Sequence, residues 1–313
     1  MTQLEQYRDP TEIRHVIGAA GSFSLGNISG DIRIRGTDTE EAVVIARGEG
    51  ELLPMIVRRS EGALHIEVDQ KPFTGFMSWF RERADVEFDI SLPRGARVDV
   101  NSVSADVQVR DLVGEQSYKT VSGDLSLFDA GGRVNITTVS GDVRLDAEQA
   151  VEPHLSTTSG DFQVAARSIR ALQLRTVSGD ADLRAGFETG VEHAIETVSG
   201  DVSIEARSGL TVDVKRGLEL SGHGAKQRVV GDGAARLRFR SLSGDLSVIG
   251  PHGEKARRAP EATAFSTPPA PPAAPQAPRP TQPDSLEILQ ALERGEIDVE
   301  EAARRLEGAG SHG

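Results

Sequence analysis

A four-residue motif, Val-Ser-Gly-Asp or a close relative, recurs along most of this chain and constrains its fold more than any other feature. From the second copy onward, the aspartates are spaced by 18, 18, 19, 19, 21 and 44 residues. The last gap is twice 22, and a degraded copy at Leu220–His223 lies near its middle, which we interpret as one more repeat. A period of this length indicates a stack of similar structural units. The eight aspartates are Asp31, Asp106, Asp124, Asp142, Asp161, Asp180, Asp201 and Asp245.

Apolar residues keep fixed distances from most of these aspartates. Around Asp142 they lie eight, six and three residues before it and one and three after it, at Val134, Ile136, Val139, Val143 and Leu145. Alternation of apolar and polar residues indicates β-strands with one buried face. The alternation breaks between the Thr and the Val before each Ser, which indicates a bend or bulge between two strands. We expect all five apolar positions to face a shared interior.

The length of the repeat selects the architecture. Eighteen to twenty-two residues are too few for a four-stranded propeller blade but suit one coil of a β-helix, whose inward side chains pack on the next coil. We therefore predict an all-β fold, a single-stranded β-helix or solenoid over residues 23–250, after a lead-in at 1–22. Between the first two copies, strands of less regular coils are expected at Ala42–Ala46, Ile56–Arg58, Ala63–Val68 and Val86–Leu92.

An aromatic cluster interrupts this pattern at residues 72–83. Its spacing suits a short amphipathic helix, which could contact a membrane interface or a partner protein. The alternative is a lid over an open edge of the solenoid. The candidate contact residues are Phe73, Phe76, Trp79 and Phe80.

Two further segments follow the repeats. Residues 251–283 hold ten prolines, which predicts an extended, semi-rigid and disordered linker. Residues 284–309 carry apolar residues at helical spacing on both sides of Gly295, which predicts a small α-hairpin. Helices this short are marginal alone, so we expect this tail to self-associate or to dock on a partner. The candidate contact residues are Leu286, Leu289, Leu292, Ile297 and Leu306.

The Ser-Gly-Asp motif has two interpretations. As a structural corner, its glycine supplies a backbone conformation or a close approach, and its Ser or Asp bonds to local backbone N–H groups. As a ladder of carboxylates, it could bind Ca²⁺, although the glycine-rich nonapeptide of calcium-binding β-rolls is absent. We favour the corner and expect neither metal nor cofactor. The glycines are Gly30, Gly123, Gly141, Gly160, Gly179, Gly200 and Gly244, whereas Ala105 takes that place before Asp106.

Net charge and motif content narrow the function classes. A formal charge of -13 disfavours nucleic acid as a partner. The seven histidines show no HExxH spacing, and Walker A and GxSxG motifs are absent. Because the acidic residues recur in register, they do not single out a catalytic pair. We expect a non-enzymatic binding or scaffold protein, with a membrane-associated envelope-stress regulator and a glycan-active β-helix enzyme as alternatives.

Cell location has only weak signals in this sequence. Met1–Pro10 is polar, and no apolar stretch of 18 residues occurs, so the pattern favours a protein that is cytoplasmic or peripheral to the membrane. The chain has no cysteine, which excludes a disulfide framework.

The Thr-Val-Ser-Gly-Asp repeats at Thr120–Leu125, Thr138–Val143 and Thr197–Val202 resemble those of a bacterial family of putative adhesins of unknown function. The resemblance covers roughly Phe23 to Val248 and implies a right-handed β-helix and an envelope role, with no catalytic residues to assign. The tail from Ile288 to Ala302 is similar to a helix-pair module of envelope-stress proteins. The partner that we expect is a protein or cell-envelope component, and the short helices of the tail also suit homo-oligomers.

Overall fold

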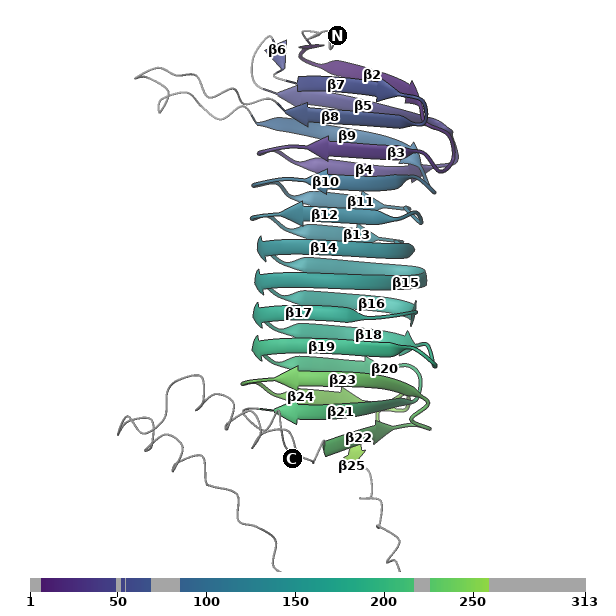
Figure 1. Cartoon of the computed structure of the whole chain (residues 1–313), viewed down its shortest axis with the longest axis vertical. Helices are drawn as coiled ribbons and strands as arrows, with labels where there is room; N and C mark the ends of the chain where they lie inside the picture. Colours follow the sequence, from purple (N-terminus) through teal and green to yellow (C-terminus); the bar gives the residue numbers. More distant parts are fainter. Residues whose placement is uncertain (1–6, 49–51, 54, 69–84, 217–225, 259–313) are drawn as a thin grey trace, which may run out of the picture. The chain divides into compact units, whose positions relative to one another are not determined.

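The computed structural model describes residues 7–48, 52–53, 55–68, 85–216 and 226–258. They belong to one compact unit that runs to Ala259. Every regular element among them is a β-strand, and the strands lie one above the next (Figure 1). The predicted all-β solenoid is therefore confirmed for this unit. The aromatic cluster from Phe73 to Phe80 and the tail residues from Leu286 to Leu306 lie outside the described residues.

No helix long and apolar enough to cross a membrane occurs within the described ranges.

Each coil contributes one strand to each of two faces, and both faces are parallel ladders through most of the stack. Face A holds the strands that lead into the Ser-Gly-Asp corners, together with one further strand at each end. In spatial order these are β8 (Ala63–Val68), β3 (Ser22–Gly26), β10 (Arg97–Asn101), β12 (Gln116–Thr120), β14 (Gly132–Ser140), the second half of β15 (Val143–Ser159), β17 (Gln173–Ser178), β19 (Glu192–Ser199), β23 (Ala235–Ser241) and β21 (Leu210–Arg216).

Face B holds the strands that leave the corner. In spatial order these are β9 (Val86–Pro93), β4 (Ile32–Thr37), β11 (Val107–Arg110), β13 (Leu125–Phe128), the first half of β15, β16 (Phe162–Ile169), β18 (Ala181–Phe187), β20 (Val202–Ala206) and β24 (Leu246–Ile249).

Antiparallel strands extend both faces at their ends. They are β5 (Glu41–Gly48) beside β9, β2 (Thr11–Val16) beside β5, β7 (Met55–Ser60) beside β8, β22 (Lys226–Val230) beside β21, and β25 (Arg257–Arg258) beside β22. A separate pair joins β1 (Tyr7–Arg8) and β6 (Leu52–Leu53).

The core forms from four of the five predicted apolar positions. Val134, Ile136, Val143 and Leu145 are all buried, and their equivalents in the neighbouring coils stack on them in register. Because every coil adds the same inward positions, the interior is one continuous ladder of aliphatic and aromatic side chains. Each buried aliphatic side chain contributes roughly 1.5–3 kcal/mol relative to exposure.

The fifth position corrects our expectation, because from Asp106 onward the residue three before the aspartate is exposed. Val139 is 49% exposed, whereas Thr138 beside it is buried. The Thr138 hydroxyl donates a hydrogen bond to the carbonyl oxygen of Ser140 at 2.9 Å, which satisfies the buried hydroxyl and fixes the turn. The bend predicted from the broken alternation is present, but the polar residue rather than the apolar one faces the interior.

Spatial order also corrects the interpretation of the 44-residue gap. The amide of Asp245 donates directly to a carboxylate oxygen of Asp201 at 2.7 Å, so no further coil lies between them. The intervening chain instead forms β21 and β22, which lie beyond β23. Leu220–His223 falls outside the described residues.

A similar excursion occurs after the first repeat. Strand β4 pairs with β11 on one side and with β9 on the other, so the Asp31 coil stacks directly on the Asp106 coil. The four segments predicted as strands between these copies are strands of the same sheet, within β5, β7, β8 and β9. Two of them, β5 and β7, run antiparallel to their neighbours rather than as coils.

The C-terminal boundary of the domain also lies later than the sequence suggested. Residues 255–258, which we placed in the linker, still pair with the sheet: Lys255 bridges Ile249, and Arg257 pairs with Val229. At the other end, β2 and the buried Ile13 place the predicted lead-in inside the domain.

Candidate functional site

The glycine of each corner meets a demand that no other residue can satisfy. From Gly123 to Gly244 the six corner glycines have φ between 114° and 134°, which L-residues avoid. A Cβ atom at any of them would lie 2.1–2.3 Å from a carbonyl oxygen of the corner in the preceding coil. Both reasons proposed for the glycine, the conformation and the close approach, therefore apply. Ala105 is outside this set because its φ is not positive.

The aspartates form a hydrogen-bonded ladder along the corner. The amide of each one donates to Oδ1 of the aspartate in the preceding coil, at 2.7–2.9 Å, in six consecutive steps from Asp106 to Asp245. Carboxylates one coil apart repel by about 1 kcal/mol in water, and charge-assisted hydrogen bonds oppose this repulsion. The bonds link successive coils, rather than closing the local turn as we expected. We call these seven residues the Asp ladder: Asp106, Asp124, Asp142, Asp161, Asp180, Asp201 and Asp245.

Outward apolar side chains form a second row beside the Asp ladder. Their backbones stack in register, as in the amide of Ser140 donating to the carbonyl of Val121 at 2.9 Å. The apolar members are between 44% and 59% exposed, and Thr158 replaces one of them. Exposed apolar residues that gather in one row indicate an interaction surface. We call this row the apolar stripe: Val103, Val121, Val139, Thr158, Val177, Val198 and Leu242.

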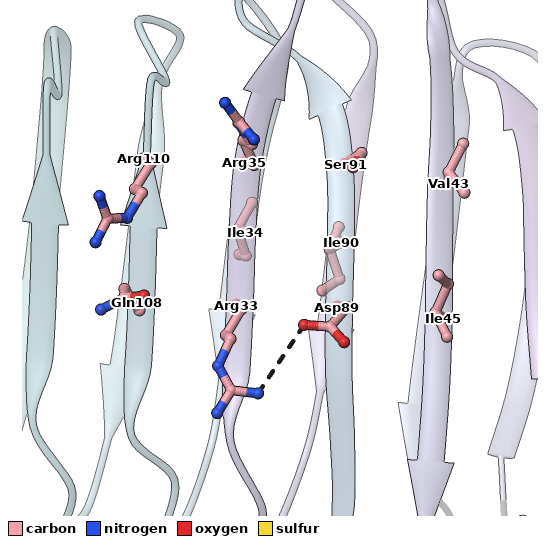
Figure 2. Close-up of a pocket in the computed structure, with 10 residues that line it drawn as sticks. All are labelled: Arg33, Ile34, Arg35, Val43, Ile45, Asp89, Ile90, Ser91, Gln108 and Arg110. Atoms are coloured by element: carbon pink, nitrogen blue, oxygen red, sulfur yellow. Dashed lines mark ion pairs between the residues drawn. The ribbon is translucent and has the colours of Figure 1, made fainter. Parts of the chain in front are cut away.

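A groove of about 280 Å³ lies on face B near the N-terminal end. It is formed by β4, β5, β9 and β11, and Figure 2 shows its side chains projecting from these adjacent strands. Arg33 forms ion pairs with Asp31 at 2.6 Å and with Asp89 at 3.9 Å. The groove-lining residues are Arg33, Ile34, Arg35, Val43, Ile45, Asp89, Ile90, Ser91, Gln108 and Arg110.

We did not identify this groove from the sequence, although a signal was present. Arg35 and Arg110 each lie four residues after a repeat aspartate, so they occupy equivalent positions in their coils. Their pairing follows only if the Asp31 and Asp106 coils are neighbours. The long separation between those two copies concealed this.

Two buried polar residues within the core have structural roles. Gln116 donates to the carbonyls of Leu112 and Gly131 and accepts from the Tyr118 hydroxyl. His193 accepts the amide of Leu172 at 3.2 Å through Nδ1, while its Nε2 lies 2.9 Å from the carbonyl of Glu188. Burial lowers the pKa of His193, so its uncharged form is favoured in the fold.

The Asp ladder was one candidate for a metal site. Within the described ranges, no group of three or more His, Asp or Glu side chains is placed to hold a metal ion. Instead, the observed contact of each carboxylate from Asp106 to Asp201 is with a backbone amide.

One protein family and several solved structures match this chain. Residues 21–217 match the family model described as Toastrack DUF4097. A crystal structure of a putative adhesin from Bacteroides fragilis covers 79% of this chain and 99% of its own, at 12% identity and a TM-score of 0.46. A putative adhesin from Parabacteroides distasonis covers 78% and 94%, at 9% identity and a TM-score of 0.33. No curated protein matches the chain.

Proposed function

This chain belongs to the Toastrack DUF4097 family, and from that premise we propose that it is a non-enzymatic, adhesin-like binding or scaffold protein. Its binding surface is the corner of the solenoid, where the apolar stripe and the Asp ladder run side by side. The partner is an extended protein segment of the cell envelope that carries both apolar and basic side chains.

The observation that carries this proposal is the outward apolar stripe. The buried positions on either side of the corner already supply the core, so the exposed side chains at Val121, Val139 and Val177 are not needed for folding. Strands stack at about 4.8 Å, and an extended segment lying along the corner would meet an apolar side chain at nearly every coil. Burying these side chains against a partner removes apolar surface from water, which favours association.

The charge of the Asp ladder selects among partners. Its seven carboxylates are all exposed, and a row of one sign favours a partner of opposite charge and steers its approach. Basic side chains in the partner would neutralise the row, whereas acidic ones would be repelled. The formal charge of -13 on the whole chain also favours partners with basic side chains.

The same regularity favours binding over catalysis. A glycan-cleaving site needs a singular pair of carboxylates in different environments, whereas the Asp ladder repeats one environment at every coil. The contact of each carboxylate from Asp106 to Asp201 with a backbone amide suits a structural and recognition role.

The proposal is tested by comparing binding of two full-length variants to envelope fractions of the native host. V121S/V139S/V177S removes part of the apolar stripe, and Q163S/Q173S changes exposed, outward residues away from the corner. We expect the first variant to lose at least most of the binding and the second to keep it. Equal binding by both variants, or no binding by the wild type, would contradict the proposal.

The tail at 284–309 has a separate role in this proposal, as the oligomerisation or docking segment. Its support is the helical spacing of Leu286, Leu289 and Leu292. Light scattering of the full chain and of a form ending at Pro283 tests it. We expect a larger mass only for the full chain, and a monomer in both cases would remove self-association from the proposal.

A membrane-associated envelope-stress regulator is the second candidate, favoured by the aromatic spacing of Phe76, Trp79 and Phe80. Cell fractionation separates the candidates, and it also tests our proposal that the protein is cytoplasmic or peripheral to the membrane. Protein that stays in the soluble fraction before and after envelope stress would exclude the second candidate. A shift to the membrane fraction that is lost in F76S/W79S/F80S would favour it.

A further inference from the structure

Two arginines occupy neighbouring positions in the groove on face B. Arg35 on β4 pairs in register with Arg110 on β11, and on its other side Arg35 is level with Ser91 on β9. Figure 2 shows Arg110, Arg35 and Ser91 at the same height along three adjacent strands. Like charges placed directly side by side in a sheet destabilise it, so this arrangement calls for a compensating group.

The nearby acidic side chains do not supply that compensation. Asp89 pairs with Arg33 and Arg47, and Asp31 pairs with Arg33. Among the residues that the structure describes, neither Arg35 nor Arg110 has a carboxylate within ion-pair distance. The two guanidinium groups therefore retain free N–H donors.

Phe128 orients one of the two arginines. The guanidinium carbon of Arg110 lies 4.7 Å from the centre of the Phe128 ring, a cation–π contact that supports the flat face of the group. Stacking uses the face and leaves the N–H edge available for hydrogen bonds. Phe128 lies on β13, on the side of β11 away from β4, so Arg110 turns from this contact to share an anion with Arg35.

The local charge of the groove differs from that of the chain. Three arginines and one aspartate line it, which gives a formal charge of +2, on a chain whose net charge is -13. Arginine pairs bind phosphate through parallel N–H···O bonds. A phosphate monoester carries about -1.5 to -2 charges at neutral pH, which matches the groove. Half-buried Val43 and Ile45 provide an apolar wall beside the cationic row.

We propose that this groove is a binding site for an organic phosphate monoester. The N–H groups of Arg35 and Arg110 donate to the phosphate oxygens, the Ser91 hydroxyl donates one further hydrogen bond, and Val43 and Ile45 contact the organic part. The site shares no residue with the apolar stripe or the Asp ladder, so it stands apart from the corner surface of the proposed function.

The test is a titration of the full chain with phenyl phosphate, followed by calorimetry and by amide chemical shifts. We expect binding with shifts at β4, β9 and β11. Inorganic phosphate should bind more weakly because it lacks the apolar part, and acetate more weakly still because of its lower charge. Absence of phenyl phosphate binding at millimolar concentration would overturn the proposal.

Matched variants separate the groove from general charge effects. Arg35→Gln and Arg110→Gln should each weaken phenyl phosphate binding by about tenfold, the loss of a charged hydrogen bond worth ~1.4 kcal/mol. Arg184→Gln is the control, because Arg184 occupies the same position of its coil on β18, outside the groove. A similar loss in all three variants would show non-specific charge attraction and would overturn the site.

The phosphate could belong to a small molecule or to a lipid headgroup, and vesicles distinguish these sources. Phosphatidylcholine vesicles with and without phosphatidic acid are compared for the wild type and for Arg35→Gln. Binding that requires both phosphatidic acid and Arg35 would support the site and assign a lipid source. Phenyl phosphate binding without vesicle binding would support the site and assign a small molecule.

Discussion

The central coils and the two ends of the solenoid follow different rules. From Asp106 to Asp201 each coil stacks on the one that precedes it in the chain, and every ladder is parallel. At the ends the chain doubles back. The Asp31 coil lies between strands β8–β9 and β10–β11, and β21 lies beyond β23 although it precedes it in sequence.

This difference shows how the two ends of a repeat stack can be terminated. A parallel ladder that simply stopped would leave a row of unpaired N–H and C=O groups, which invites pairing with other chains. Antiparallel strands end the parallel ladders here, with β2 and β5 at one end and β22 and β25 at the other. The central coils therefore follow the repeat, whereas the end strands depart from it and terminate the parallel ladders.

The largest expected effect comes from a corner glycine in the centre. Gly141→Ala adds a Cβ atom 2.2 Å from the carbonyl oxygen of Gly123, at φ 119°, and should lower the free energy of unfolding by roughly 2–5 kcal/mol. Gly190→Ala is the control, since its φ is 80° but nothing lies within 4 Å of the added atom, and it should cost roughly 1–2 kcal/mol. Urea denaturation measures both. Equal losses would mean that the stacking contact does not matter.

A change in the N-terminal end should act locally. Val44 on β5 is fully buried and pairs with Ile13 and Ile90, so Val44→Ala should cost about 2 to 3 kcal/mol. In a repeat stack each unit contacts only its neighbours, so hydrogen exchange should speed up in β2 and β5 and remain slow in β16 and β18. Val16→Ala, at a position that is 63% exposed, should change nothing. Faster exchange throughout the molecule would make centre and end one cooperative unit.

Two valines of the same coil test which side of the corner faces inward. Val143→Ala removes buried methyl groups and should destabilise the protein by about 2 kcal/mol, whereas Val139→Ala, at an exposed position, should change stability by less than about 0.5 kcal/mol. Thermal denaturation compares them directly. A marked loss in Val139→Ala would restore the inward placement that we predicted from the sequence.

The smallest effect is a pH dependence near the C-terminal end. The folded-state pKa of His193 is lowered by burial, so the unfolded chain takes up a proton that the folded chain resists. The contribution of His193 is complete above its ordinary pKa of about 6.5 and is lost as pH falls from there through the lowered folded-state pKa. His193→Gln should remove this part of the pH dependence of the free energy of unfolding, which urea denaturation across this pH range measures. An unaltered profile in His193→Gln would assign the acid sensitivity to other groups.

Prediction from the sequence succeeded where one rule governs many coils. Positions such as Val134 and Leu145 could be assigned to the interior because the same spacing recurs around most aspartates. It failed for Val139, because alternation shows that a bend exists but not which of two adjacent residues turns inward. The side-chain hydrogen bond of Thr138 decides that, and a buried threonine with an internal partner is as acceptable as a buried valine.

Of the two candidate sites, one was visible in the sequence and the other was not. The Asp ladder was visible as a row of aspartates, yet the bond from each amide to the carboxylate of the preceding coil depends on coil stacking. The groove at Arg35 and Arg110 was not visible, because it requires two coils separated in sequence to be neighbours in space.

The sequence alone determined that this protein is a stack of β-coils with glycine-aspartate corners, since a local period fixes which side chains share an interior. Only the tertiary structure decided the order of the coils at the ends and the orientation of the stripe. The physical reason is that edge closure and coil adjacency depend on pairing between distant strands, and many chain paths satisfy the same local period. Which arginines meet across the sheet follows from that pairing and from nothing nearer in the chain.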